Sequence, residues 1–306
     1  MTTTRALNAA HGLPTHLTVI EGPGGLPMID VDNAHATARI CLHGGQVLAY
    51  RPRGAVADLL FVSEQALYQP GKAIRGGVPV CWPWFGPDPQ GLGRPAHGFA
   101  RTRRWDLRQS AALSGGETRL VLGLRDTAET RALWPHAFDL SLTVNVGATL
   151  TLALTTHNTG SAPFTVTQAL HSYCAVGDIA QARVQGLDGC AYVDKAAGAG
   201  GAVRRQDGDV TVTAEVDRIY TGTPPSLTLV DGALHRRVRI ASEGSRTAVV
   251  WNPWATIAAG MADLPDDAYQ RFVCVETTNV EPGDAVTLAP GDHHTLAQQL
   301  NAEPCR

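Results

Sequence analysis

Apolar and polar residues alternate with a period of two in several segments of this sequence, most clearly in residues 138–146 and 149–158. The apolar positions are Leu140, Leu142, Val144 and Val146 in the first segment and Leu150, Leu152 and Leu154 in the second. Successive side chains of a strand point to opposite faces, so each segment predicts a strand with one buried face. Gly147 and Ala148 between them indicate a hairpin connection.

Short segments of similar character occur along the rest of the chain, bounded by Gly, Pro, Asp and Asn. They are residues 17–20, 36–42, 46–51, 58–62, 105–109, 119–125, 164–171, 183–185, 210–216, 226–230, 236–241, 247–251, 271–276 and 294–300. Helical periodicity is nearly absent, although residues 263–270 suit a turn or a short helix. Short strands joined by Gly- and Pro-rich turns predict an all-β sandwich or barrel. The sequence shows no fixed repeat, which disfavours a propeller.

The predicted organisation is one large β-domain over residues 16–306, preceded by a flexible tail over residues 1–15. The chain has 306 residues, enough for a sizeable core. A glycine-rich segment at residues 196–202 is expected to form a loop rather than a domain linker, because strands of the same character lie on both sides of it. We therefore expect a single domain.

Composition excludes several classes of function. The net charge is -3 with His neutral, so there is no basic footprint for nucleic acid. No apolar run reaches the length of a membrane span, and the first residues lack the apolar core of a signal peptide, so we expect a cytoplasmic protein. The six cysteines are scattered without a CxxC pair, which predicts reduced thiols and no metal site.

One stretch, from Ile74 to Arg101, is unlike the rest of the chain. It is rich in Gly and Pro, but Trp82, Trp84 and Phe85 favour burial. It also carries His97 and three arginines: Arg75, Arg94 and Arg101. A long ordered loop with basic side chains predicts a site for a polar, anionic ligand. The alternative is a structural loop with solvated charges.

Three other polar residues stand at or near strand ends. His171 ends an apolar strand, Glu276 follows the apolar run 272–275, and Asp217 lies beside Arg218. A buried carboxylate needs a partner or a function. Each residue also has a structural interpretation: a hydrogen-bonded histidine, a solvated glutamate and a salt-bridged aspartate. The residues alone do not decide between these interpretations.

Six segments considered together resemble the hexose-6-phosphate mutarotases, the glucose-6-phosphate 1-epimerase branch of the aldose 1-epimerase superfamily. They are Ile74-Arg-Gly-Gly, His97-Gly-Phe-Ala-Arg101, Leu170-His-Ser-Tyr-Cys-Ala-Val-Gly-Asp-Ile179, Val216-Asp-Arg-Ile-Tyr220, Val250-Trp-Asn-Pro-Trp254 and Arg271-Phe-Val-Cys-Val-Glu276. The resemblance spans most of the chain, in the family's order. It implies a β-supersandwich similar to galactose mutarotase, with an open sugar cleft, and a monomer.

The resemblance also implies roles for individual residues. His171 and Glu276 match the catalytic pair. Arg75, Arg101 and Asp217 match substrate-binding positions, and His97 falls where the superfamily has a second, sugar-binding histidine. The sequence departs from the pattern at Ala96, where many members of the branch carry a Gln that contacts substrate. The roles of Arg94, Arg103 and Arg104 stay open.

These residue types suit the exchange of sugar anomers. A glutamate removes the proton of the anomeric hydroxyl, a protonated histidine protonates the ring oxygen, and reclosure presents the other face of the aldehyde. No cofactor or metal is needed, and the expected partner is a small-molecule sugar phosphate held by arginines. Two alternatives remain: an epimerase of unphosphorylated aldoses, which the arginines disfavour, and a non-catalytic carbohydrate-binding module. The second is disfavoured because binding alone does not require an acid and a base together.

Overall fold

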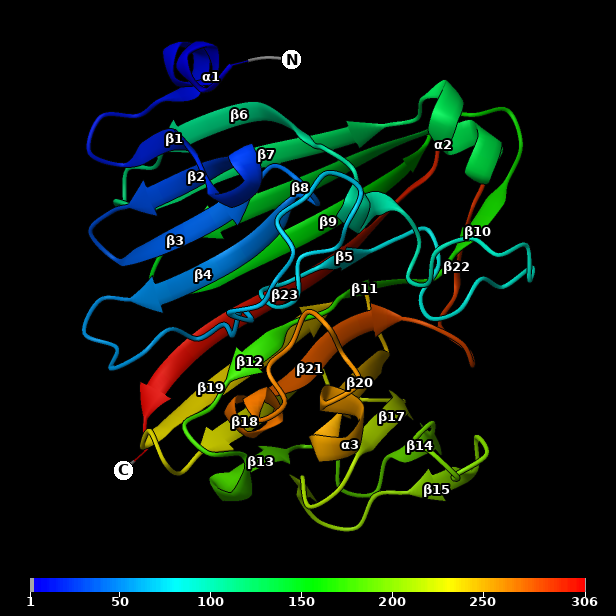
Figure 1. Ribbon diagram of the computed structural model, residues 1–306. Coiled ribbons are helices and arrows are strands. Elements are labelled where there is room, and N and C mark those ends of the chain that lie inside the picture. The colour runs from blue at the N-terminus through cyan, green and yellow to red at the C-terminus, as the bar shows by residue number, and fades with distance from the viewer. Residues whose placement is uncertain (1–2, 306) are drawn as a thin grey trace.

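The predicted hairpin at residues 138–158 lies inside the largest sheet of the computed structural model, which describes residues 3–305 (Figure 1). Within these residues that sheet has nine strands. In spatial order they are β16 (Val210–Thr211), β13 (Ala182–Gln185), β18 (Ser226–Asp231), β19 (Arg236–Glu243), β23 (His293–Pro304), β9 (Leu150–Asn158), β8 (Phe138–Val146), β7 (Thr118–Arg125) and β6 (Asp106–Ala112). The alternation in β8 and β9 is confirmed, because apolar positions are buried and the polar ones between them are partly exposed.

A second sheet of the described residues positions the polar strand-end residues. Its order is β15 (Val203–Arg205), β14 (Ala191–Asp194), β17 (Val216–Thr221), β20 (Thr247–Asn252), β21 (Phe272–Asn279), β11 (Gln168–Leu170) and β5 (Val80–Cys81), with β12 (Tyr173–Ala175) also paired to β21. Strands β11 and β21 pack on β23 of the larger sheet. The second sheet therefore packs on the larger one through β23.

The remaining strands cover the other half of the nine-stranded sheet. They are β1 (Leu17–Glu21), β2 (Pro27–Asp32), β3 (Ala36–Cys41) and β4 (Gln46–Pro52), with a separate pair, β10 (Phe164–Val166) and β22 (Val286–Leu288). Strand β3 packs on β8, and in Figure 1 the blue sheet lies over β7 and β8. A single apolar cluster joins the three large sheets through residues such as Val47, Leu142 and Val275. The prediction of an all-β fold is confirmed.

Helices are few and short among the described residues. They are α1 (Thr4–His11), α2 (Ala128–Leu133) and α3 (Trp254–Ala258), with 3-10 turns at η1 (Pro23–Gly25), η2 (Ala100–Thr102), η3 (Ile179–Gln181) and η4 (Ala268–Arg271). The expected turn within residues 263–270 corresponds to η4 and the bends before it. No helix in this part of the chain is long and apolar enough to span a membrane.

The prediction of a flexible tail over residues 1–15 is wrong for the part that the structure describes. Residues Thr4–His11 form α1, whose first turn is capped by the Thr3 hydroxyl. Leu7 is buried, and the Asn8 side chain accepts a hydrogen bond from the Val19 N–H and donates one to its carbonyl. These tertiary contacts hold a helix that local sequence did not predict.

Three predicted strands are also corrected. Residues 58–62 form isolated bridges, through Leu60 and Val62, rather than a strand. Residues 210–216 contain only the short β16 and the first residue of β17. Residues 164–171 divide into β10 and β11 at Thr167, whose hydroxyl accepts the Phe85 N–H. In each case the apolar pattern extends beyond the few residues whose backbone pairs with a neighbouring segment.

The stretch from Ile74 to Arg101 is an ordered loop that contains the short strand β5 and ends in η2. Two glycines in it allow close backbone approaches. Gly76 has φ 114°, and a Cβ there would lie 2.4 Å from the Phe61 carbonyl oxygen. Gly98 has φ 69°, and a Cβ there would lie 2.0 Å from the Trp82 carbonyl oxygen. Because they follow Arg75 and His97 directly, these glycines fix where those two side chains leave the backbone.

Candidate active site

A cavity of about 620 Å³ lies between the second sheet and the loop 74–101. Its volume is within the range of small-molecule sites, which is roughly 300–1,000 Å³. All six residues singled out in the sequence line it: Arg75, His97, Arg101, His171, Asp217 and Glu276. We call the side formed by His171, Tyr173, Asp217, Trp251 and Glu276 the strand wall. The side formed by Arg75, Phe85, His97 and Arg101 is the loop wall.

Strand register brings the strand wall together. Asp217 on β17 is opposite Trp251 on β20, and Trp251 is opposite Cys274 on β21. Glu276 is two residues beyond Cys274 and so points to the same face of the sheet. Residues spread over more than 100 positions of sequence therefore meet on one surface.

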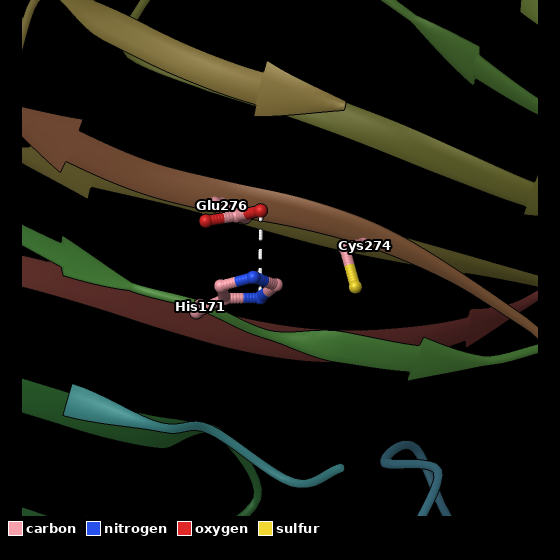
Figure 2. A group of neighbouring side chains, drawn as sticks. All are labelled: His171, Cys274 and Glu276. Atoms are coloured by element: carbon pink, nitrogen blue, oxygen red, sulfur yellow. Dashed lines mark ion pairs between the residues drawn. The ribbon is translucent and has the colours of Figure 1, made fainter. Parts of the chain in front are cut away.

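His171 occupies the break between β11 and β12, next to Glu276. Its backbone N–H donates to the Pro79 carbonyl, and the Val275 N–H donates to the Ser172 carbonyl across the break. The His171 Nδ1 lies 3.4 Å from Glu276 Oε1 (Figure 2). The exposed fractions of the two side chains are 10% and 1%. Within residues 3–305, the His171 Nδ1 and both Glu276 carboxyl oxygens have no hydrogen-bond partner.

Burial shifts the two groups in opposite directions. It lowers the pKa of His171 well below its usual value, and His97, Arg101 and Arg75 lower that pKa further. It raises the pKa of Glu276 well above its usual value, assisted by the charge of Asp217. Both shifts favour the uncharged pair, a protonated carboxyl beside a neutral imidazole. A buried pair of this kind titrates as a unit rather than as two independent groups.

Asp217 is a third perturbed group on the strand wall. Burial, followed by the charge of Glu215, raises its pKa to about 6, while Lys195 lowers it. Lys195 also lines the cavity, and its backbone N–H donates to the Asp217 carbonyl at 2.7 Å. Asp217 thus changes charge close to neutral pH at the cavity surface.

Arg75 on the loop wall is held by two partners. Its Nη2 lies 3.1 Å from Asp263 Oδ2, and its Nη1 donates to the Tyr173 hydroxyl at 3.0 Å. Asp263 comes from the segment between α3 and η4, so a third part of the chain orients this guanidinium. The exposed fraction of the Arg75 side chain is 23%, which leaves it accessible from the cavity.

His97 and Arg101 complete the loop wall. The Nδ1 of His97 accepts the Gly86 N–H at 3.3 Å, which places the proton of the neutral ring on Nε2. Burial lowers the pKa of His97 to about 3, and the charges of Arg101 and Arg75 contribute. Arg101 donates from Nη2 to the Ala96 carbonyl at 2.9 Å, while its buried Nε has no hydrogen-bond partner within the described residues. The loop wall therefore presents a neutral imidazole and two guanidinium groups.

The family model of aldose 1-epimerase matches residues 27–301, which include all six site residues. The chain belongs to the aldose 1-epimerase family. Two relatives of this epimerase are named as candidate glucose-6-phosphate 1-epimerases. One, from Escherichia coli K12, is 38% identical over 275 residues, with 90% of each chain covered. The other, from Cenchrus ciliaris, is 34% identical over 295 residues, covering 94% of this chain and 88% of the relative.

Solved structures agree with this assignment. A candidate mutarotase from Salmonella typhimurium is 33% identical to this epimerase, with a TM-score of 0.88 and 95% of each chain covered. A galactose mutarotase related enzyme from Lactobacillus acidophilus has a TM-score of 0.71 at 12% identity, covering 90% of this chain and 97% of that one. The second likeness concerns the fold alone. The family resemblance and the mutarotase-like sandwich expected from the sequence are confirmed.

Three other arginines, in the loop 74–101 or just after it, have structural contacts instead. Arg94 hydrogen-bonds the Asp88 carboxylate and the Leu133 carbonyl and lies 4.3 Å above the Trp84 ring. The Arg94 contact also holds the pKa of Asp88 well below its usual range. Arg103 pairs with Glu129 at the surface, and the backbone of Arg104 bridges His43. Arg94 thus stiffens the loop and is not among the residues that line the cavity.

The tryptophans divide between core and cavity. The Trp82 and Trp84 side chains are buried in the main apolar cluster, as expected for most of them. Trp251 lines the cavity, where it offers an aromatic surface beside Asp217.

Cys274 lies close to the pair, and the possible ligand atoms of His171, Cys274 and Glu276 all fall within 4.8 Å of one another (Figure 2). Burial raises the pKa of the Cys274 thiol well above its usual value, so the thiol stays protonated. The charge of Glu276 raises that pKa further, whereas the charge of Arg75 lowers it. We assign no metal to this group, and no step proposed below uses one.

Sequence reasoning missed three residues of the epimerase site: Tyr173, Lys195 and Asp263. Tyr173 lies two residues after His171, and this spacing was the available signal for a shared face. Asp263 contacts Arg75 across 188 residues of sequence, and Lys195 is placed by a backbone bond to β17. Neither of these contacts leaves a local pattern in the sequence.

Proposed function

We propose that this epimerase interconverts the α and β anomers of a hexose 6-phosphate by acid–base ring opening and reclosure, with D-glucose 6-phosphate as the best candidate. The observation that carries the proposal is the His171–Glu276 pair, whose facing atoms lie 3.4 Å apart without other partners. Leaving two such groups buried and unsatisfied is costly. The names of the relatives from Escherichia coli and Cenchrus ciliaris support the substrate.

His171 and Glu276 together carry one proton before and after ring opening. The Glu276 carboxylate takes the proton of the anomeric hydroxyl as the C1–O1 double bond forms. The bond between C1 and the ring oxygen breaks, and the ring oxygen takes a proton from the His171 imidazolium. Rotation about C1–C2 turns the other aldehyde face toward the hydroxyl at C5. Closure then runs the same transfers in reverse and regenerates the starting protonation state.

The electrostatics of the site residues themselves favour the protonation state halfway through this reaction. Burial favours a protonated Glu276 and a neutral His171, which is the state that ring opening produces. Ring opening requires the same proton on the other partner, so that His171 is protonated and Glu276 is ionised. The positive charges of Arg75 and Arg101 oppose that state. A phosphate dianion bound near them offsets these charges and favours the acid form of His171.

Arg75 and Arg101 are the proposed phosphate-binding groups. Guanidinium groups bind phosphate oxygens through paired, charge-assisted hydrogen bonds. Arg101 has a buried Nε without a partner in the described residues, and Arg75 is oriented by Asp263 and Tyr173. Asp217 and His97 are proposed to bind sugar hydroxyls. The Asp217 carboxylate accepts a hydrogen bond, and the Nε2–H of His97 donates one.

Measuring anomer exchange tests the proposal directly. Magnetisation exchange between the α and β forms of glucose 6-phosphate is compared with that of glucose at equal concentration and pH. We expect the enzyme to accelerate exchange of the phosphorylated sugar far more than that of glucose. Equal acceleration supports an epimerase of free aldoses, and binding without acceleration supports a carbohydrate-binding module. Either result overturns the proposal. The monomeric state and cytoplasmic location expected from the sequence stay predictions.

A further inference from the structure

Tyr173 stands between Arg75 of the loop wall and His171 of the strand wall. Its hydroxyl accepts a hydrogen bond from Arg75 Nη1 at 3.0 Å. Its ring stacks on the His171 imidazole, with centroids 5.0 Å apart and an interplanar angle of 11°. Tyr173 is 2% exposed and lines the cavity. A single rigid side chain thus contacts both a proposed phosphate-binding group and a proposed catalytic group.

The Tyr173 ring is itself firmly held. Its backbone N–H donates to the Gly77 carbonyl, and its own carbonyl accepts the Phe61 N–H. Behind the ring, Phe272 packs at a centroid distance of 5.2 Å and Trp251 packs nearly edge-on at 6.0 Å. These contacts leave the ring little freedom to reorient. The plane that it offers to His171 is therefore fixed by the fold.

Apart from the 3.4 Å approach of its Nδ1 to Glu276, the His171 imidazole is oriented mainly by neighbouring rings. Its Nδ1 has no hydrogen-bond partner among residues 3–305. Phe85, His97 and Trp251 meet the ring at interplanar angles of 45°, 66° and 80°. The torsion that turns an imidazole about its Cβ–Cγ bond has a broad minimum. The parallel face of Tyr173 is the contact that defines the ring plane.

The same face also favours a positive charge. The face of an aromatic ring attracts cations within about 6 Å of its centroid, and the His171 ring lies inside this distance. The ionisable and charged groups near His171 are Glu276 and Cys274 on β21, Asp217 on β17, and Arg75, His97 and Arg101 from the loop wall. Burial, both arginines and His97 oppose the imidazolium. Tyr173 is a neutral neighbour whose ring face lies within the distance at which a cation is attracted.

We propose that Tyr173 is a positioning residue: its stacked face orients His171 and stabilises the imidazolium, while its hydroxyl orients Arg75. The kinetic part of this proposal rests on the proposed epimerase function. The two contacts belong to different parts of one side chain and are therefore separable by substitution. Tyr173→Phe keeps the face and removes the hydroxyl, and Tyr173→Leu removes both.

Kinetics of the two variants give the first test. For Tyr173→Phe we expect kcat within about threefold of the native value and a several-fold higher KM for glucose 6-phosphate, since a neutral-to-charged hydrogen bond is lost. For Tyr173→Leu we expect kcat to be about 2- to 30-fold lower than for Tyr173→Phe, which is the range of a cation–π contact. We also expect the kcat–pH profile of this variant to change. Phe272→Leu is the matched control, because within the described residues Phe272 packs on Tyr173 and its ring does not contact the His171 ring. It removes one of the two rings that hold Tyr173 but keeps the Tyr173 face on His171, so it should alter the pH profile much less than Tyr173→Leu does.

A second readout needs no substrate. The ¹⁵N and ¹³C signals of the His171 imidazole, assigned by their loss in His171→Asn, are titrated in the free protein. We expect Tyr173→Leu to move the His171 titration to lower pH, and Tyr173→Phe and Phe272→Leu to move it much less. If the native protein fails to exchange anomers, the proposed function fails, but this titration still decides the role of Tyr173. A folded Tyr173→Leu protein with an unchanged His171 titration overturns the proposal. If that variant does not fold, Tyr173→Met takes its place with the same expected and overturning results.

Discussion

The two walls of the cavity differ in how their polar groups are satisfied. On the loop wall, Arg75 is bonded to Asp263 and Tyr173, and His97 accepts the Gly86 N–H. On the strand wall, neither oxygen of Glu276 has a hydrogen-bond partner within the described chain, and His171 Nδ1 has none either. Among the described residues the irregular loop wall leaves one buried polar side-chain atom without a partner, the Nε of Arg101, whereas the strand wall leaves three.

This difference corresponds to two proposed tasks: the loop wall holds the substrate, and the strand wall transfers protons. A group that must hold a ligand in one place benefits from being fixed before the ligand arrives. A group that must give or accept a proton needs a free lone pair or hydrogen aimed at the substrate. Rigid strands hold Glu276 in place without side-chain hydrogen bonds, which leaves both oxygens free for the proton transfer. The predictions below change one wall at a time.

The largest effect is expected from Glu276→Gln on the strand wall. The amide is similar in size but cannot accept the anomeric proton, so kcat for exchange should fall by about 10²- to 10⁴-fold. Removing a carboxyl whose buried ionised form is disfavoured should not unfold the protein. Exchange spectroscopy and circular dichroism measure the two quantities. A folded variant with native kcat would show that the pair is not the catalytic one.

Arg101→Ala on the loop wall should act on binding rather than on proton transfer. Losing a charged hydrogen-bond donor costs about 1.5–3 kcal/mol, so KM for glucose 6-phosphate should rise by about 10- to 160-fold, with a much smaller change for glucose. Arg103→Ala is the matched control, because Arg103 pairs with Glu129 at the surface and is not among the cavity residues. An equal loss for both sugars would contradict the assignment of Arg101 to the phosphate.

Gly98→Ala should disturb the loop wall through the backbone. The added Cβ would lie 2.0 Å from the Trp82 carbonyl oxygen, and φ is 69°. The left-handed conformation alone costs about 1–2 kcal/mol, so we expect the free energy of unfolding to fall by more than about 2 kcal/mol in total. Gly93→Ala in the same loop has φ 75° but open space around its Cβ, so it isolates the conformational cost. Denaturant titration should rank the two variants in that order.

Asp217 should control activity at acid pH. Its pKa is raised to about 6, so the carboxylate that accepts a sugar hydroxyl is lost as the pH falls through that value, and kcat/KM should fall with it. Asp217→Asn should remove this limb of the profile and lower the plateau near pH 8 by about tenfold. In Glu215→Gln the limb should move to lower pH, because the charge of Glu215 raises this pKa. An unshifted limb in both variants would assign it to another group.

Sequence reasoning predicted the sheets better than it predicted the site. The alternation of Leu140 to Val146 predicted β8 with the correct bounds, because one face of that strand is buried and the other is not. Helix α1 was missed since its stability comes from the burial of Leu7 and the bonds of Asn8 to Val19, which are tertiary. The meeting of His171 and Glu276 came from the family resemblance, because periodicity does not show which strands pair.

The smallest expected effect comes from Ala96→Gln, which introduces the side chain that many members of the branch carry there. Ala96 is exposed next to His97, so a longer side chain fits without displacing the core. Its carbonyl already orients Arg101 through a backbone contact that the substitution keeps. A new neutral hydrogen bond to the sugar is worth about 0.5–1.5 kcal/mol, which lowers KM by about 2- to 12-fold at unchanged kcat. Because the change adds a contact on the loop wall alone, an altered kcat would show that the two walls are not independent at this position.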